Sequence, residues 1–225
     1  MDKQMYTPAT PATEGGLLSQ HKVLRQTYTL LAATLLFSSL MAGVSMAMGM
    51  TSPMVYLVFV LGGFGIMMFV LPRFQDQAAG IGIIFLATGM LGFGLGPILT
   101  QYLSLPNGAS VIMTAMGGTG AIFLALSAYV LTTKKDFSFM GGFLMVGCMV
   151  VIGAVILSLF VNMPMLHVAL SGAMVMLMSG FILFDTSRII NGGETNYINA
   201  TVSLFLNIFM LFTNLLQLLG IMSDD

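Results

Sequence analysis

Residues 77–133 read QAAGIGIIFLATGMLGFGLGPILTQYLSLPNGASVIMTAMGGTGAIFLALSAYVLTT, and these 57 residues contain no Asp, Glu, Lys or Arg. A membrane-spanning helix needs about 20 consecutive apolar residues, so the stretch is long enough for two spans and a turn. Residues 104–108 (SLPNG) mark that turn with proline, asparagine and glycine. The stretch therefore predicts two transmembrane helices joined without a charged residue.

The rest of the chain repeats this pattern, with charge-free stretches at 26–72, 137–184 and 195–223. Only 7% of the residues are charged and 57% are hydrophobic, whereas a soluble domain carries roughly 25% charged residues. The first two stretches each hold two spans around a turn, at 51–53 and at 162–164, and the last holds one. Lipid offers no hydrogen-bond partners to the backbone, so the spans must be helices. The expected spans are 27–49, 54–71, 79–103, 110–133, 139–161, 165–187 and 197–220.

The seven Lys and Arg residues predict the orientation. Each long charge-free stretch folds back as a hairpin, so all the charged clusters that carry these residues return to one side, and positive residues mark the cytoplasmic face. We therefore expect a cytoplasmic N-terminus and an external C-terminus. Residues 1–25 are polar and contain Pro and Gly, which indicates a flexible cytoplasmic tail; residues 26–221 form the transmembrane domain, and 222–225 a short acidic tail.

Several classes of function are excluded by composition. One cysteine, Cys148, allows no disulfide, CxxC-type zinc or iron–sulfur site within the chain, and a net charge of -1 provides no basic surface for nucleic acid. Two histidines, His21 and His167, cannot form a zinc-protease motif. His167 and Ser171 lie four apart and could form a nucleophile–base pair, but no orienting carboxylate is near them in the sequence, so a histidine close to the membrane interface is the favoured interpretation. We expect a protein that is not an enzyme and holds no metal or cofactor.

A few polar residues near or within the spans deserve a functional interpretation. Asp185 lies near the cytoplasmic end of the sixth span, three residues before Arg188. It is either an interfacial carboxylate paired locally, or a titratable gate that pairs with Arg188 or Arg73 and releases on protonation. Asn207 and Asn214 share one face of the last span, where amides hold helices together by hydrogen bonds or, alternatively, ligate an ion.

Small residues are concentrated in the third span. Gly92 and Gly96 form a GxxxG pair, which permits close contact between helices. The glycines of the spans are therefore expected to serve packing, with a gating hinge as the alternative.

Two adjoining segments, 184–190 (FDTSRII) and 192–198 (GGETNYI), resemble the signature of the Bax inhibitor-1 family. Residues 21–25 (HKVLR), 96–99 (GPIL) and 127–136 (SAYVLTTKKD) are similar to its bacterial branch, which modulates the membrane protease FtsH. The likeness runs from about residue 21 to 222. The signature residues are Gly192, Gly193, Glu194, Asn196 and Tyr197.

The resemblance implies a fold in which six helices surround a central C-terminal helix, placing Asn207 in the middle of the bundle. It also implies a bacterial inner-membrane protein. In the protease-modulator branch the protein is both a substrate and a slow competitor of FtsH, which it meets together with the associated membrane scaffold proteins. The N-terminal tail would then be the handle that the protease grips.

The alternative is a pH-sensitive calcium leak, with Ca²⁺ as the partner. In the calcium-leak members of the family, an acid at the position of Asp185 shares protons with a second acid in the last helix, within a motif resembling residues 204–208. Here that second position is Asn207. A shared proton requires two interacting carboxylates, so the sequence favours the protease modulator.

Overall fold

The computed structural model describes residues 13–158, 160 and 163–223, and in these the chain is helical without any strand. The helices are α1 (Thr13–Ala47), α2 (Pro53–Gly65), the π-helix η1 (Ile66–Val70), α3 (Leu71–Phe74), α4 (Ala79–Leu103), α5 (Gly108–Thr133), α6 (Met140–Ser158), α7 (Pro164–Ile190) and α8 (Tyr197–Ser223). Because α2, η1 and α3 run on as one span, the described residues form seven helices long and apolar enough to cross a membrane. The expected all-α integral membrane fold is confirmed.

The turns opposite the charged loops occur where the sequence predicted them. Pro53 and Pro164 are the first residues of α2 and α7, a position at which proline costs no hydrogen bond. Gly49, just after α1, has a φ of 67°, a left-handed conformation that favours glycine. Gly108 begins α5.

The start of α1 differs from the expectation. Residues 13–25 were assigned to the tail, but the structure begins the helix at Thr13. The last proline of this region is Pro11, so no residue after it blocks a helix. Residues 1–12 lie outside the described part of the chain.

The second span also contains a feature that the sequence analysis did not predict. Five residues, Ile66–Val70, form a π-helix, and the amide of Leu71 donates to the carbonyl of Ile66. Pro72 follows directly. A proline ring clashes with the carbonyl four residues earlier in a regular α-helix, and the wider π turn relieves this clash.

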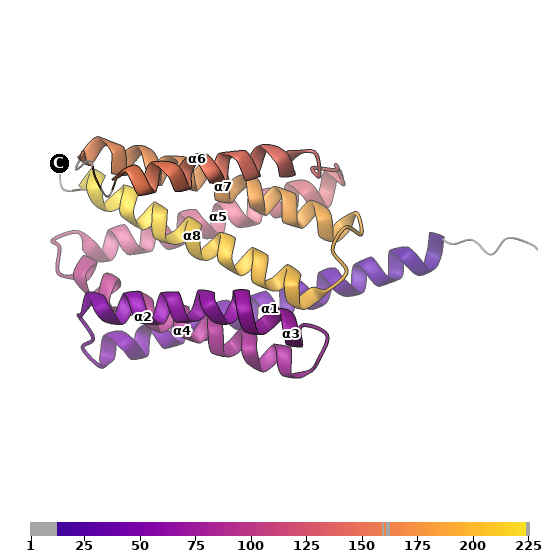
Figure 1. Cartoon of the computed structure of the whole chain (residues 1–225), viewed down its shortest axis with the longest axis horizontal. Coiled ribbons are helices and arrows are strands. Elements are labelled where there is room, and N and C mark those ends of the chain that lie inside the picture. Colours follow the sequence, from indigo (N-terminus) through magenta and orange to yellow (C-terminus); the bar gives the residue numbers. More distant parts are fainter. Residues whose placement is uncertain (1–12, 159, 161–162, 224–225) are drawn as a thin grey trace, which may run out of the picture.

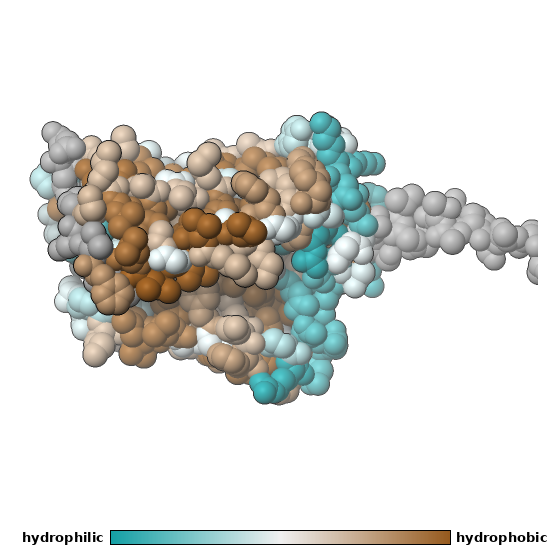
Figure 2. Space-filling model, turned by 45° about the horizontal axis from the view of Figure 1, so that its top comes forward, coloured by the Kyte–Doolittle hydropathy of each residue, from teal (hydrophilic) through white to brown (hydrophobic). Residues whose placement is uncertain are grey.

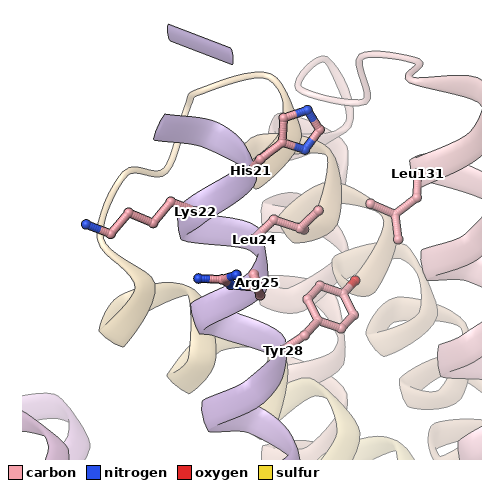
Figure 3. Close-up of a pocket in the computed structure, with 6 residues that line it drawn as sticks. All are labelled: His21, Lys22, Leu24, Arg25, Tyr28 and Leu131. Atoms are coloured by element: carbon pink, nitrogen blue, oxygen red, sulfur yellow. The ribbon is translucent and has the colours of Figure 1, made fainter. Parts of the chain in front are cut away.

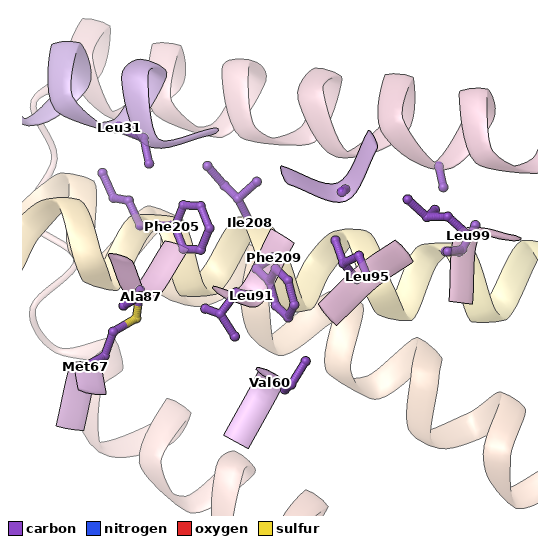
Figure 4. Packing of buried hydrophobic residues seen from close by; sticks show 14 of the residues in the cluster. Leu31, Val60, Met67, Ala87, Leu91, Leu95, Leu99, Phe205, Ile208 and Phe209 are labelled. Atoms are coloured by element: carbon purple, nitrogen blue, oxygen red, sulfur yellow. The ribbon is translucent and has the colours of Figure 1, made fainter. Parts of the chain in front are cut away.

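Helix α8 lies between two groups of helices, with α1, α2 and α4 on one side and α5, α6 and α7 on the other (Figure 1). Its aromatic side chains Phe205 and Phe209 point into the first group, toward Leu91 and Leu95 of α4 (Figure 4). Leu211 of α8 belongs to a second cluster, with residues of α6 and α7. All six other spans thus contribute buried residues to clusters that contain α8, as expected for a central last helix.

Close contact between α1 and α4 depends on glycine. A Cβ atom at Gly92 would meet the carbonyl oxygen of Ser38, one at Gly96 would meet Ser45, and one at Gly89 would lie 2.6 Å from the ring of Phe37. The predicted packing role of the GxxxG pair is confirmed.

The surface of the bundle has the pattern that a membrane requires. On the face shown in Figure 2, hydrophobic side chains cover the middle, and hydrophilic ones gather at the end where α1 begins. Large apolar residues such as Met68 and Phe143 are more than 70% exposed, which is stable only against lipid.

Candidate functional site at the charged end of the bundle

Three loops meet at the end of the bundle where α1 begins. They join α3 to α4 (residues 75–78), α5 to α6 (134–139) and α7 to α8 (191–196). Together with the ends of the adjoining helices they carry most of the charged residues of the described chain. The signature segments of the sequence analysis lie in the third loop and the two helices next to it.

Asn196 joins the third loop to the first. Its side-chain oxygen accepts hydrogen bonds from the amides of Ile198 (2.9 Å) and Asn199 (3.4 Å), which caps the start of α8. Its amide nitrogen donates to the carbonyl of Gln75 (3.2 Å) and to Asp76 Oδ1 (2.9 Å). One side chain therefore starts the central helix and ties it to a loop about 120 residues earlier in the chain.

The glycines of the signature end α7. Gly192 has a φ of 78°, in the left-handed region. The turn lets the amides of Gly193 (2.8 Å) and Glu194 (3.1 Å) donate to the carbonyl of Arg188. The chain reverses here, and the carboxylate of Glu194 comes to lie 3.5 Å from the guanidinium of Arg188.

Ser187 joins the third loop to the second, and the sequence analysis missed it. This fully buried side chain accepts a hydrogen bond from the amide of Phe137 (2.8 Å) and donates to the carbonyl of Lys135 (3.3 Å). Its partners lie about 50 residues away, so spacing could not reveal them. Its place within the resembling segment 184–190 was the only signal available.

Asp136, in the same second loop, accepts a hydrogen bond from the amide of Ser138 at 2.8 Å. The side-chain and backbone hydrogen bonds from Ser138 hold the pKa of the Asp136 carboxyl below its usual range. The carboxylate therefore supports the turn before α6 in its ionised form.

Asp185 and Asn207 meet inside the bundle. Both are less than 10% exposed, and Asn207 Nδ2 donates to Asp185 Oδ2 at 2.8 Å. The residues come from α7 and α8, the two helices that follow each other through the third loop. A buried carboxylate here is matched by an amide donor, so the pair holds one titratable group.

The two arginines proposed as counter-charges have other partners. Arg188 pairs with Glu194 and lies 5.6 Å from the centre of the Phe184 ring. The guanidinium of Arg73 donates to the carbonyl of Phe69 in its own span. Among the described residues no ion pair within 4 Å joins Asp185 to either arginine, and the titratable gate stays a prediction.

The remaining polar residues of the prediction have local roles. Asn214 Nδ2 donates to the carbonyl of Met210 at 2.7 Å, within α8. Tyr197, half-buried, packs against a small cluster that includes Leu71 and Ile84 and accepts a hydrogen bond from Thr201 at its carbonyl (2.7 Å). Asn214 lies seven residues from Asn207, but the structure does not bring the two amides to a common partner.

Comparison with known proteins shows the family to which the chain belongs. The family model described as "Inhibitor of apoptosis-promoting Bax1" matches residues 20–224. The chain is 48% identical over 209 residues to "Modulator of FtsH protease YccA" of Escherichia coli K12, covering 93% of this chain and 94% of the relative. It is 49% identical over 208 residues to an uncharacterized membrane protein of Vibrio cholerae (92% and 93% covered), and 48% identical over 203 residues to an uncharacterized protein of Pseudomonas aeruginosa (90% and 90%). The chain is a member of the Bax inhibitor-1 family.

Proposed function

We propose that this protein is a non-enzymatic modulator of the inner-membrane protease FtsH. The observation that carries the proposal is its 48% identity, over nearly the whole of both chains, to the E. coli protein whose name states that role. The charged end of the bundle, with its Lys and Arg residues, would face the cytoplasm by the positive-inside rule. FtsH and its membrane scaffold proteins are the partners that follow from this proposal.

The mechanism combines a handle with a bundle that is hard to unravel. An ATP-dependent protease needs a segment that it can grip, and termini outside a packed core are the usual choice. Residues 1–12, with Pro8 and Pro11, precede α1 in the sequence, and α1 begins at the charged end of the bundle. Pulling on them strains α1, which packs along α4 and α8. To extract more of the chain, the protease would therefore first have to disrupt the packing of α1 on α4 and α8. It would stay bound to this protein during that time and could not degrade another substrate.

The clasp that Asn196 and Ser187 make at the charged end supports the resisting half of this mechanism. Their hydrogen bonds join three loops that lie next to the site where pulling would begin. A force applied at that end meets contacts between segments far apart in the chain. Such contacts must break together, which raises the barrier to local unfolding.

The calcium leak is the less favoured alternative. The one observation in its favour is the buried polar pair Asp185 and Asn207. A buried ionisable residue in a span invites a functional role, but a single carboxylate beside an amide lacks the coupled titration of two acids. Calcium flux into proteoliposomes at acidic and neutral pH is therefore expected to be absent from the wild-type protein and from Asp185→Asn alike.

The handle is tested by deleting residues 2–12, which leaves all of α1 in place. The matched control keeps the same eleven residues in scrambled order, so that length and composition are unchanged. In cells that contain FtsH, the deletion should lengthen the half-life of the protein several-fold, whereas the scrambled variant should turn over like the wild type.

Equal half-lives for the wild type and the deletion variant would mean that FtsH does not use residues 2–12 to grip the protein. A scrambled variant as stable as the deletion would instead mean that FtsH reads a specific sequence in the tail. Either result leaves the modulator role to be tested by the effect of the protein on a second FtsH substrate.

A further inference from the structure

A pocket opens at the charged end, between α1 and α5, away from the hydrogen bonds of Asn196 and Ser187. It has a volume of about 690 Å³ and is lined by His21, Lys22, Leu24, Arg25, Tyr28 and Leu131. In Figure 3, Leu24 and Tyr28 of α1 extend toward Leu131 of α5, and the imidazole of His21 lies above them. Leu24, Tyr28 and Leu131 thus form an apolar side of the pocket, whereas the charged ends of Lys22 and Arg25, which also line it, extend in this view to the other side of α1.

The pocket exists because α1 and α5 pack on different neighbours. Helix α1 packs mainly on α4 and α8, and α5 on α8 and α7. The two come together where the rings of Tyr28 and Phe123 lie 5.9 Å apart, centre to centre. This ring pair lies about one helical turn beyond Arg25 along α1.

Its cations have no acidic partner in the part of the chain that the structure describes. Lys22 and Arg25 are both exposed, lie three residues apart and so share a face of α1, and make no ion pair within 4 Å among the described residues. The six lining residues include no Asp or Glu. The positive charge of these two residues is thus available to an anion.

The hydroxyl of Tyr28 is also without a partner. It is shielded from solvent and makes no hydrogen bond to any described residue. Buried hydroxyl groups are normally hydrogen-bonded, so an orphan hydroxyl in the wall of a basic pocket indicates a site for an acceptor that is not part of the chain. A phosphate oxygen is such an acceptor.

We propose that this pocket binds the phosphate group of an anionic phospholipid from the surrounding leaflet. Lys22 and Arg25 would attract the phosphate, Tyr28 would donate a hydrogen bond to an ester or phosphate oxygen, and Leu24 and Leu131 would contact the glycerol and the first methylenes. A lipid is favoured over a soluble phosphate because the pocket lies where α1 enters the membrane and because half of its lining is apolar. Basic pockets between transmembrane helices on the cytoplasmic side are typical sites for anionic headgroups.

The test is a lipid titration of the purified full chain followed by native mass spectrometry. Phosphatidylglycerol is compared with phosphatidylcholine, which has the same glycerol phosphate but no net charge, and inorganic phosphate is a third arm. The variants are Lys22→Gln with Arg25→Gln, and Tyr28→Phe, which keeps the ring contact with Phe123. The matched control is Lys134→Gln with Lys135→Gln, two exposed lysines at the same end that do not line the pocket.

We expect phosphatidylglycerol to bind more tightly than phosphatidylcholine and inorganic phosphate to bind only weakly. One juxtamembrane cation contributes about fivefold to binding at an anionic surface, so the loss of both should weaken phosphatidylglycerol binding roughly 25-fold. Tyr28→Phe should weaken it about tenfold, since a hydrogen bond to a charged group is lost. The lysine control should stay within about twofold of the wild type.

Three results would overturn the proposal. Equal binding of the two lipids would mean that the negative charge of the headgroup does not contribute to recognition. An equal loss in the lysine control would mean a general attraction to the charged end, and tight binding of inorganic phosphate would make this a site for a soluble anion. If the double variant does not fold, Tyr28→Phe alone decides the outcome, because a phenylalanine preserves the ring packing.

Discussion

Asn196→Ala should weaken the bundle more than its position at a loop suggests. Asn196 is only half-buried, yet its side chain makes four hydrogen bonds, two that cap α8 and two that reach the α3–α4 loop. Loss of an asparagine cap costs about 1 kcal/mol. A net hydrogen bond contributes about another 1 kcal/mol, and we halve this value for the exposed bond to Asp76.

The sum predicts a loss of about 2 to 2.5 kcal/mol in the free energy of unfolding. Two substitutions divide this value. Asn196→Asp keeps the capping oxygen but removes the donor and places a carboxylate beside Asp76, so it should lose about 1.5 kcal/mol from the two donated bonds and somewhat more through like-charge repulsion, while keeping the cap. Asn199→Ala, three residues further along α8, is the matched control, and we expect less than about 0.5 kcal/mol for it.

The assay is unfolding in mixed micelles at increasing fractions of SDS. Far-UV circular dichroism follows the helices, and the reaction of Cys148, the single cysteine of the chain, follows the loss of packing around α6. If Asn196→Ala and Asn199→Ala have the same midpoint, the loops are not held together by Asn196 and the clasp is wrong.

Three further substitutions test the packing and the buried groups. Gly92→Leu should destabilise the bundle by about 1 to 3 kcal/mol through overpacking, measured by the same unfolding assay, whereas Gly82→Leu on the same helix, where a Cβ has open space, should have little effect. Asn207→Leu, which leaves the Asp185 carboxylate without its donor, should cost about 2 to 3 kcal/mol, and Asp185→Asn, which keeps an amide acceptor, should cost less; equal losses would contradict a hydrogen-bonding role. The lowered pKa of Asp136 means that its contribution is present above the carboxyl's unfolded pKa and is lost as the pH falls through the folded value; Asp136→Asn should therefore flatten the pH dependence of stability below about pH 4, and an unchanged acid limb would refute this.

Much of the fold could be predicted from the sequence because the membrane imposes simple rules. A span needs a fixed length of apolar residues, charges cannot remain inside, and turns need proline or glycine. These rules predicted seven helices and the turns at Pro53, Gly108 and Pro164, and the structure has them. Local spacing also predicted the close packing at Gly92.

The parts that could not be predicted depend on contacts between distant residues. Charge alone suggested Arg188 as the partner of Asp185, but the left-handed turn at Gly192 brings Glu194 back to that arginine instead. The role of Ser187 depends on a loop some 50 residues away. The resemblance brought these residues to attention without stating what they contact.

The early start of α1 and the π-helix had a different cause. Both depend on whether a helix begins, ends or continues at a given residue. A polar composition does not by itself prevent a helix, and a proline does not always end one. At Thr13 no proline blocks the helix, and before Pro72 the chain widens its turn rather than ending the span. The spacing of the charged residues along the sequence indicates neither feature.

The central claim is that this protein slows FtsH on other membrane substrates, and the most direct measurement reconstitutes both in one proteoliposome. The half-life of a second membrane-bound FtsH substrate is followed while the amount of this protein increases, with ATP hydrolysis measured in parallel. The account predicts a half-life that lengthens with dose, a slow loss of this protein itself, and a weaker effect from the variant that lacks residues 2–12. A substrate half-life unchanged at a severalfold excess of the full chain would contradict it.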